Sequence, residues 1–129
     1  MRVLAIDHGI ARAGCAISDP TGTLVRPLDV LEPPDPAAVA AVAREHGAEL
    51  VVVGMPVSLD GSEGEQADLA SEFRDRLAAM LDVPVETYDE RLTTRMAEAT
   101  AREGAAAPPD ALAAAHLLEA FLASRRERP

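Results

Sequence analysis

Hydrophobic residues gather in five short runs along the chain. They cover residues 3–7, 13–18, 23–31, 49–56 and 83–90. The first and fourth runs are apolar almost throughout, which is typical of strands buried on both faces of a sheet. The second and third follow the first at hairpin spacing, with Asp19 to Gly22 as the turn between them. The pattern therefore predicts an opening antiparallel meander of three strands, and two later strands.

Helical segments separate and follow the later strands. They are expected near residues 36–46, 62–81, 94–102 and 110–122. Asp35 can cap the first of them, Pro36 suits its first position, and Gly47 ends it. The second helix carries an apolar stripe at nearly helical period: Leu69, Phe73, Leu77, Met80 and Leu81. Asp110 follows two prolines and is expected to cap the last helix.

Alternation of strands and helices in the second half predicts a parallel portion with right-handed crossovers. Joined to the meander, it gives a mixed five-stranded sheet covered by helices, an α/β fold. We find no internal repeat, linker or second hydrophobic core pattern. Residues 1–129 are therefore expected to form a single domain.

The charge balance limits the classes of partner. The net charge is −10, and all 12 basic residues are arginines. A protein that binds polyanions non-specifically has a basic face, and the negative net charge argues against such a protein. An enzyme acting on nucleic acid is still compatible, because it needs only a local basic surface, and divalent cations in an acidic site would add positive charge.

The single cysteine, Cys15, excludes an internal disulfide and fits a reducing cytosol, where it is expected to be a small buried hydrophobe. The N-terminus lacks the apolar core of a signal peptide, and no run approaches the length of a membrane span. We therefore expect a cytoplasmic protein without membrane attachment.

Four carboxylates lie where chemistry is expected. Asp7 ends the first buried strand, the pair Asp89 and Glu90 ends the fifth, and Asp110 begins the last helix. Ligands of open α/β sheets bind at the carboxyl ends of the strands. Taken singly, Asp7 could serve a turn and Asp110 a helix cap. Taken together, they suggest a site for one or two Mg²⁺ or Mn²⁺ ions, since hard cations prefer carboxylate oxygens.

Four stretches also resemble a known family. "VLAIDHGIARAGCAISDP", "VVVGMPVSLDGSEGEQA", "VETYDERLTT" and "DALAAAHLLEAFL" match, in order and spacing, the YqgF/RuvX family. Its members are described as Holliday-junction resolvases and as pre-16S rRNA nucleases. The resemblance implies a ribonuclease H-like fold, with helices on both faces of the sheet. It also implies a metal-dependent phosphodiesterase whose acidic site corresponds to Asp7, the Asp89–Glu90 pair and Asp110.

The two acidic residues of the fifth strand compete for one role. In the sheet implied by the resemblance, the fifth strand lies two spacings from the first, roughly 10 Å away. Glu90 is the longer residue and lies further past the apolar run, so we favour it over Asp89 as the third metal ligand beside Asp7 and Asp110. Asp89 would then hold Arg91 or cap the next helix.

Substrate contacts are expected from arginines, because a guanidinium pairs with phosphate through two hydrogen bonds. The candidates are Arg12, Arg91 and Arg95, together with Gly9; ordinary surface ion pairing is the alternative for the arginines. The family commonly has a basic pair in the first loop. Here Ala11 precedes Arg12, so only one of the two remains.

The function implied is hydrolysis of phosphodiester bonds, first of all in maturation of the 5′ end of the small-subunit rRNA precursor. Cleavage of branched DNA junctions is the alternative, and it would require a homodimer presenting two sites. Two readings from other classes are a nucleotide-binding domain of the actin and sugar-kinase kind, which needs a second domain, and a catalytically silent nucleic-acid-binding module. The complete acidic set argues against the silent module.

Overall fold

The computed structural model describes residues 1–9, 11–55, 65–89 and 108–127, with side chains left out at 55, 65–68, 89, 126 and 127. The strands are β1 (Val3–His8), β2 (Ala13–Ser18), β3 (Val25–Leu31), β4 (Leu50–Met55) and β5 (Val85–Asp89). The helices are α1 (Pro36–Glu45), α2 (Glu65–Met80) and α4 (Pro109–Glu127). The helix expected at 94–102 falls outside the described residues.

The five strands form one sheet in the order β3-β2-β1-β4-β5. β1 pairs antiparallel with β2, and β2 with β3, whereas β1 pairs parallel with β4, and β4 with β5. This arrangement confirms the predicted mixed sheet. Pro27, which lacks an N–H, lies on the edge strand β3 beside a shift in register, where a proline is tolerated.

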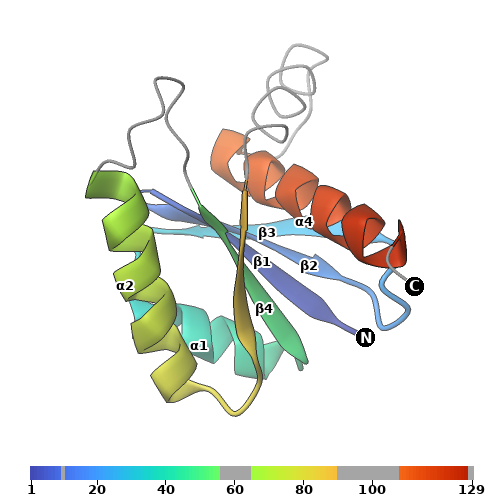
Figure 1. Cartoon of the computed structure of the whole chain (residues 1–129), viewed down its shortest axis with the longest axis horizontal. Coiled ribbons are helices and arrows are strands. Elements are labelled where there is room, and N and C mark those ends of the chain that lie inside the picture. Colours follow the sequence, from blue (N-terminus) through green and yellow to red (C-terminus); the bar gives the residue numbers. More distant parts are fainter. Residues whose placement is uncertain (10, 56–64, 90–107, 128–129) are drawn as a thin grey trace.

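Helices cover both faces of the sheet, as Figure 1 shows: α1 and α2 lie on one side and α4 on the other. Alternate residues of each strand divide between two cores. In β1, Leu4 and Ile6 pack under α1 and α2, and Val3 and Ala5 pack under α4. Odd-numbered side chains of β1 therefore face α4, and even-numbered ones face α1 and α2. The same alternation applies to Asp7 and His8 at the end of the strand.

Local capping follows the sequence at α1. The Asp35 carboxylate accepts a hydrogen bond from the backbone N–H of Ala37 at 3.0 Å, and Pro36 takes the first helical position. Gly47 ends the helix with a φ of +66°, a left-handed conformation that costs glycine little. These features confirm the predicted start and end of the first helix.

The apolar stripe of α2 was predicted too long. Phe73 and Leu77 are buried, but Leu69 and Met80 are 40% and 43% exposed. Helix α2 has 16 residues and β4 has six. At about 1.5 Å per helical residue and 3.3 Å per strand residue, the helix is the longer of the two. Leu81, which follows the helix and ends the predicted stripe, is partly buried against the core.

Helix α4, with 19 residues, is the longest of the described helices, and it buries Leu117, Leu118 and Phe121 against the sheet. Of the helices in the described ranges, none combines the length and the apolar character that crossing a bilayer requires.

Candidate active site

Asp7 lies near the carboxyl end of the central strand. Its parity in β1 is that of Val3 and Ala5, so its side chain belongs to the face covered by α4. The neighbouring strand β4 carries glycine, Gly54, near the same end. At this edge the first strand therefore supplies a carboxylate, and the adjacent position on the fourth strand supplies no side chain.

Helix α4 brings the second carboxylate to this face. The N–H of Leu112 donates to the carbonyl of Pro108 at 3.0 Å, so the helix begins at Pro109 and Asp110 lies within its first turn. The predicted N-cap role of Asp110 is therefore wrong. The physical reason is Pro109, whose fixed φ suits the first helical position and moves the start one residue earlier.

The two aspartates share one open pocket of about 190 Å³ at the edge of the sheet. Its lining residues are Asp7, His8, Gly9, Ala11, Arg12 and Asp110. Asp7 and Asp110 come from opposite ends of the chain, and the fold brings them together with Arg12 and Gly9.

Arg12 and Asp110 form an ion pair across the pocket. The Arg12 Nε lies 3.6 Å from the Asp110 Oδ2, and the two side chains are 54% and 42% exposed. Arg12 is held near the site by the β1–β2 connection, because the Gly9 N–H donates to the Arg12 carbonyl at 2.8 Å. A solvent-exposed pair of this kind stabilises a fold by little. The Arg12 guanidinium can therefore exchange the Asp110 carboxylate for another anion at small cost.

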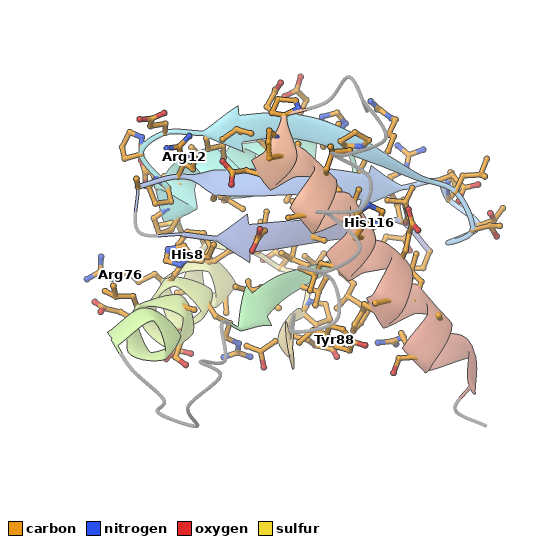
Figure 2. The ribbon with its side chains drawn as sticks, turned by 90° about the horizontal axis from the view of Figure 1, so that it is seen from above. His8, Arg12, Arg76, Tyr88 and His116 are labelled. Atoms are coloured by element: carbon orange, nitrogen blue, oxygen red, sulfur yellow. The ribbon has the colours of Figure 1, made fainter. Side chains whose placement is uncertain are left out.

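His8 belongs to the opposite layer from Asp7. Its imidazole stacks on Phe73 of α2, with ring centroids 4.5 Å apart and planes 33° apart, and Figure 2 shows it lying toward α2. Burial lowers the pKa of His8, and the neighbouring Asp7 charge opposes this shift only in part. The contact with Phe73 gives His8 a packing role at the edge of the site.

The fifth strand is tied to α4 on the same face as Asp7. Tyr88 packs edge-on against Phe121 at 5.7 Å, and its hydroxyl donates to the Ala120 carbonyl at 3.4 Å. Glu86, two residues earlier, pairs with Arg125 at 3.3 Å. Figure 2 shows Tyr88 beside α4. The even-numbered side chains Glu86 and Tyr88 of β5 thus face α4.

The remaining predicted site residues lie at the end of β5 or outside the described residues. Asp89 is the last residue of β5, and its side chain is not described. Glu90, Arg91 and Arg95 lie outside the described residues. Within the described part of the chain, no group of three or more acidic, histidine or cysteine side chains is positioned to hold a metal ion. The described site therefore consists of two aspartates and one arginine.

Gly14 lies next to this site, although the sequence interpretation did not single it out. It is the cross-strand partner of Asp7 in the β1–β2 ladder, and the backbone of Asp110 passes directly over it. A glycine inside a buried strand often marks the close approach of another backbone segment. That signal was available in "AGCAIS", but the sequence does not say which segment approaches.

Comparisons with known proteins identify relatives of this chain. The RuvX family, described as Holliday junction resolvase, matches residues 1–124. A relative from Anaeromyxobacter sp. (strain Fw109-5) is 42% identical over 135 residues, covering 97% of this chain and 98% of the relative. One from Chloroflexus aurantiacus (strain ATCC 29366 / DSM 635 / J-10-fl) is 38% identical over 138 residues, covering 98% and 90%. Both relatives are provisionally named pre-16S rRNA nuclease.

Solved structures show the same fold at lower identity. T. thermophilus RuvC in complex with a Holliday junction substrate has a TM-score of 0.67 and 23% identity, covering 98% of this chain and 97% of RuvC. The fowlpox virus resolvase with Holliday junction DNA has a TM-score of 0.62 and 12% identity, covering 97% and 99%. The predicted ribonuclease H-like fold is thereby confirmed.

Proposed function

Because the chain belongs to the RuvX family, a family of nucleases, we propose that it is a divalent-metal-dependent endonuclease acting on the 5′ end of pre-16S rRNA. The observation that carries the proposal is the shared pocket of Asp7, Asp110 and Arg12. The provisional names of its curated relatives support rRNA as the substrate. Such a role corresponds to a cytoplasmic protein.

The donor set of the pocket fits a hard cation. Asp7 and Asp110 offer carboxylate oxygens from two different elements, and Mg²⁺ is usually held by one or two protein carboxylates plus water and substrate phosphate. One or two Mg²⁺ or Mn²⁺ ions bound there would supply activation of the attacking water and stabilisation of the leaving oxygen. Asp7 and Asp110 would hold them.

Alternation along the sequence favours Glu90 as a third ligand. Glu90 has the same parity in the sequence as Glu86 and Tyr88, which face the α4 layer, whereas Asp89 has the parity of Val85, which packs in the opposite core. Asp7 and Asp110 occupy the α4 side of the sheet. We therefore keep Glu90 as the proposed ligand, with Asp89 in a supporting role.

Arg12 is proposed to bind substrate phosphate. It lies in the pocket beside Asp110, and the exposure of both side chains keeps their ion pair weak. A phosphate entering the site offers the guanidinium two oxygens in place of the carboxylate. Gly9 lines the same pocket, and Arg91 and Arg95 are proposed as further contacts.

The test is a cleavage assay with neutralised acids. Asp7→Asn and Asp110→Asn should each lower Mn²⁺- or Mg²⁺-dependent cleavage of precursor rRNA by at least about 100-fold, because losing a ligand should exceed the roughly 10–100-fold cost of losing a ligand's hydrogen-bonding partner. Asp82→Asn is the matched control, since it makes the same change at an exposed turn before β5. Full activity in either site variant, with unchanged folding by circular dichroism, would contradict the proposed site.

Cleavage of branched DNA is the second candidate, because the matching family is described as Holliday junction resolvase. This function would require two sites presented by a homodimer. A four-way DNA junction assayed beside the precursor rRNA, with and without Mn²⁺, separates the candidates. Cutting of RNA alone removes the resolvase, cutting of the junction alone removes the rRNA nuclease, and cutting of neither supports the silent binding module.

A further inference from the structure

At Gly14, the backbone of α4 lies directly against the sheet, beside the acidic pocket. A Cβ atom built on Gly14 would lie 2.0 Å from the carbonyl oxygen of Asp110, 2.4 Å from its carbonyl carbon and 3.0 Å from the nitrogen of Ala111. All three atoms belong to the backbone, so no side-chain rotation could relieve the overlap. Any larger residue at position 14 would therefore displace the start of α4 or the strand beneath it.

The same glycine is fixed relative to the other carboxylate. Gly14 pairs with Asp7 in the antiparallel ladder between β2 and β1. The ladder fixes Asp7 relative to Gly14, and the contact with Gly14 fixes how near the backbone of Asp110 can approach. The spacing of the two carboxylates thus depends on the absence of a side chain at position 14.

We infer that Gly14 is a positioning residue for metal binding: it lets the first turn of α4 rest on β2, so that Asp110 reaches the space beside Asp7. This inference rests on the proposed function, since it concerns the metal ligands proposed above. Gly14 is not among the residues that line the pocket, and it would act through the backbone of Asp110.

The size of the displacement sets the expected effect. With a methyl group at position 14, the Asp110 carbonyl oxygen would have to retreat from 2.0 Å to more than 3.0 Å, and ordinary van der Waals contact begins at 3.4 Å. Functional sites are held to within about 0.5 Å of their working geometry. We therefore expect Gly14→Ala to weaken Mn²⁺ binding at least about tenfold, the lower end of the cost of disturbing a ligand's support.

The experiment measures Mn²⁺ affinity without substrate, from the electron paramagnetic resonance signal of free Mn²⁺. Wild type, Gly14→Ala and Asp7→Asn are compared with Gly47→Ala as the matched control. Replacing Gly47 also strains the backbone, because its φ is +66°. However, a Cβ atom there would meet nothing within 4 Å, and Gly47 lies at the end of α1, outside the pocket. Gly14→Ala and Asp7→Asn should bind weakly, and Gly47→Ala should bind like wild type at temperatures below its unfolding transition.

A second substitution separates positioning from general damage. Asp110→Glu lengthens the side chain by one carbon, and a C–C bond of about 1.5 Å is similar to the retreat that Gly14→Ala imposes. In the wild-type background Asp110→Glu should weaken Mn²⁺ binding. In the Gly14→Ala background, Asp110→Glu should instead raise the Mn²⁺ affinity at least about threefold. Loss of stability alone would not make the same substitution act in opposite directions in the two backgrounds.

The outcomes distinguish this inference from the proposed function. If wild type binds no Mn²⁺, or if Asp7→Asn binds it as wild type does, the proposed metal site is contradicted whatever Gly14 does. If wild type binds and Gly14→Ala binds within twofold of it, or if Asp110→Glu brings no recovery, only the role of Gly14 is overturned. Should Gly14→Ala be unfolded in plain buffer, all variants are compared in trimethylamine N-oxide, which strengthens burial and favours the folded state.

Discussion

Cys15 shows how strongly the layers of this fold shield a single residue. It lies in β2 with no exposed surface, as the sequence predicted. Burial raises the pKa of its thiol to about 12, and the negative charge of Asp29 acts in the same direction. Because the thiolate is the reactive form, both its scarcity and its inaccessibility protect Cys15 from thiol reagents.

We therefore expect Cys15 to react with dithionitrobenzoate at pH 8 at least about 100-fold more slowly in the folded protein than in 6 M guanidinium, where the thiol pKa returns to about 8.5. Absorbance of the released thiolate measures both rates. Rapid labelling of the folded protein at the denatured rate would show that β2 opens readily and that the core beneath α1 and α2 is not closed.

At the scale of single residues, the sequence identified the acidic positions but not their roles. Asp7 was found because it ends a buried strand, and Asp110 because it begins a helix after two prolines. Its capping role was predicted wrongly, since Pro109 takes the first helical position. Gly14 was missed because its significance depends on a helix almost 100 residues away in the chain, and no local pattern records that contact.

At the scale of elements, α4 both closes one core and carries Asp110. It packs Leu117, Leu118 and Phe121 onto residues of β1 and β4 that face away from α1 and α2. The described strands and helices followed from hydrophobic runs and capping residues, but the extent of the buried stripe on α2 did not. Periodicity predicts which side of a helix is apolar. How many of those apolar residues are buried depends on the sheet beneath the helix, as the exposed Leu69 shows.

Leu118→Ala should lower the free energy of unfolding by about 2–5 kcal/mol, because the side chain is fully buried and its loss leaves a cavity. Leu69→Ala is the matched control, since the same truncation at a residue that is 40% exposed should cost within about 0.5 kcal/mol. Urea denaturation followed by circular dichroism measures both. Equal costs would mean that α2 packs along its whole apolar stripe, contrary to the exposure described above.

At the scale of the whole molecule, the mixed sheet was predictable from the order of its elements, and the neighbours of the central strand followed only from the family resemblance. The spacing of hydrophobic runs cannot tell which strands pair, because parallel pairing is set by long crossovers rather than by local turns. The face that binds substrate was not predictable either. The chain carries a net charge of −10, and within the described pocket Arg12 is matched by two carboxylates.

This balance makes electrostatic repulsion part of the proposed mechanism, and it predicts a gain of binding from an inactivating change. Asp110→Asn removes a negative charge from the pocket and releases Arg12 from its ion pair. In EDTA, we therefore expect it to bind labelled precursor rRNA about fivefold more tightly than wild type. That factor corresponds to about 1 kcal/mol, the interaction of two unit charges about 4 Å apart in water. Fluorescence anisotropy at fixed ionic strength measures the affinities.

Asp82→Asn tests whether this gain comes from the pocket or from the overall charge. It changes the net charge by the same amount, but Asp82 precedes β5, whose five residues separate it from the carboxyl edge. At about 3.3 Å per residue that separation exceeds the Debye length of about 10 Å at 0.1 M salt, so its effect on binding at the pocket should be screened. An equal gain from both variants would show that RNA responds to the net charge of the chain rather than to the pocket of Asp7 and Asp110. A gain from Asp110→Asn alone, together with loss of cleavage, would mean that the carboxylate that hinders RNA binding in EDTA is also required for the reaction.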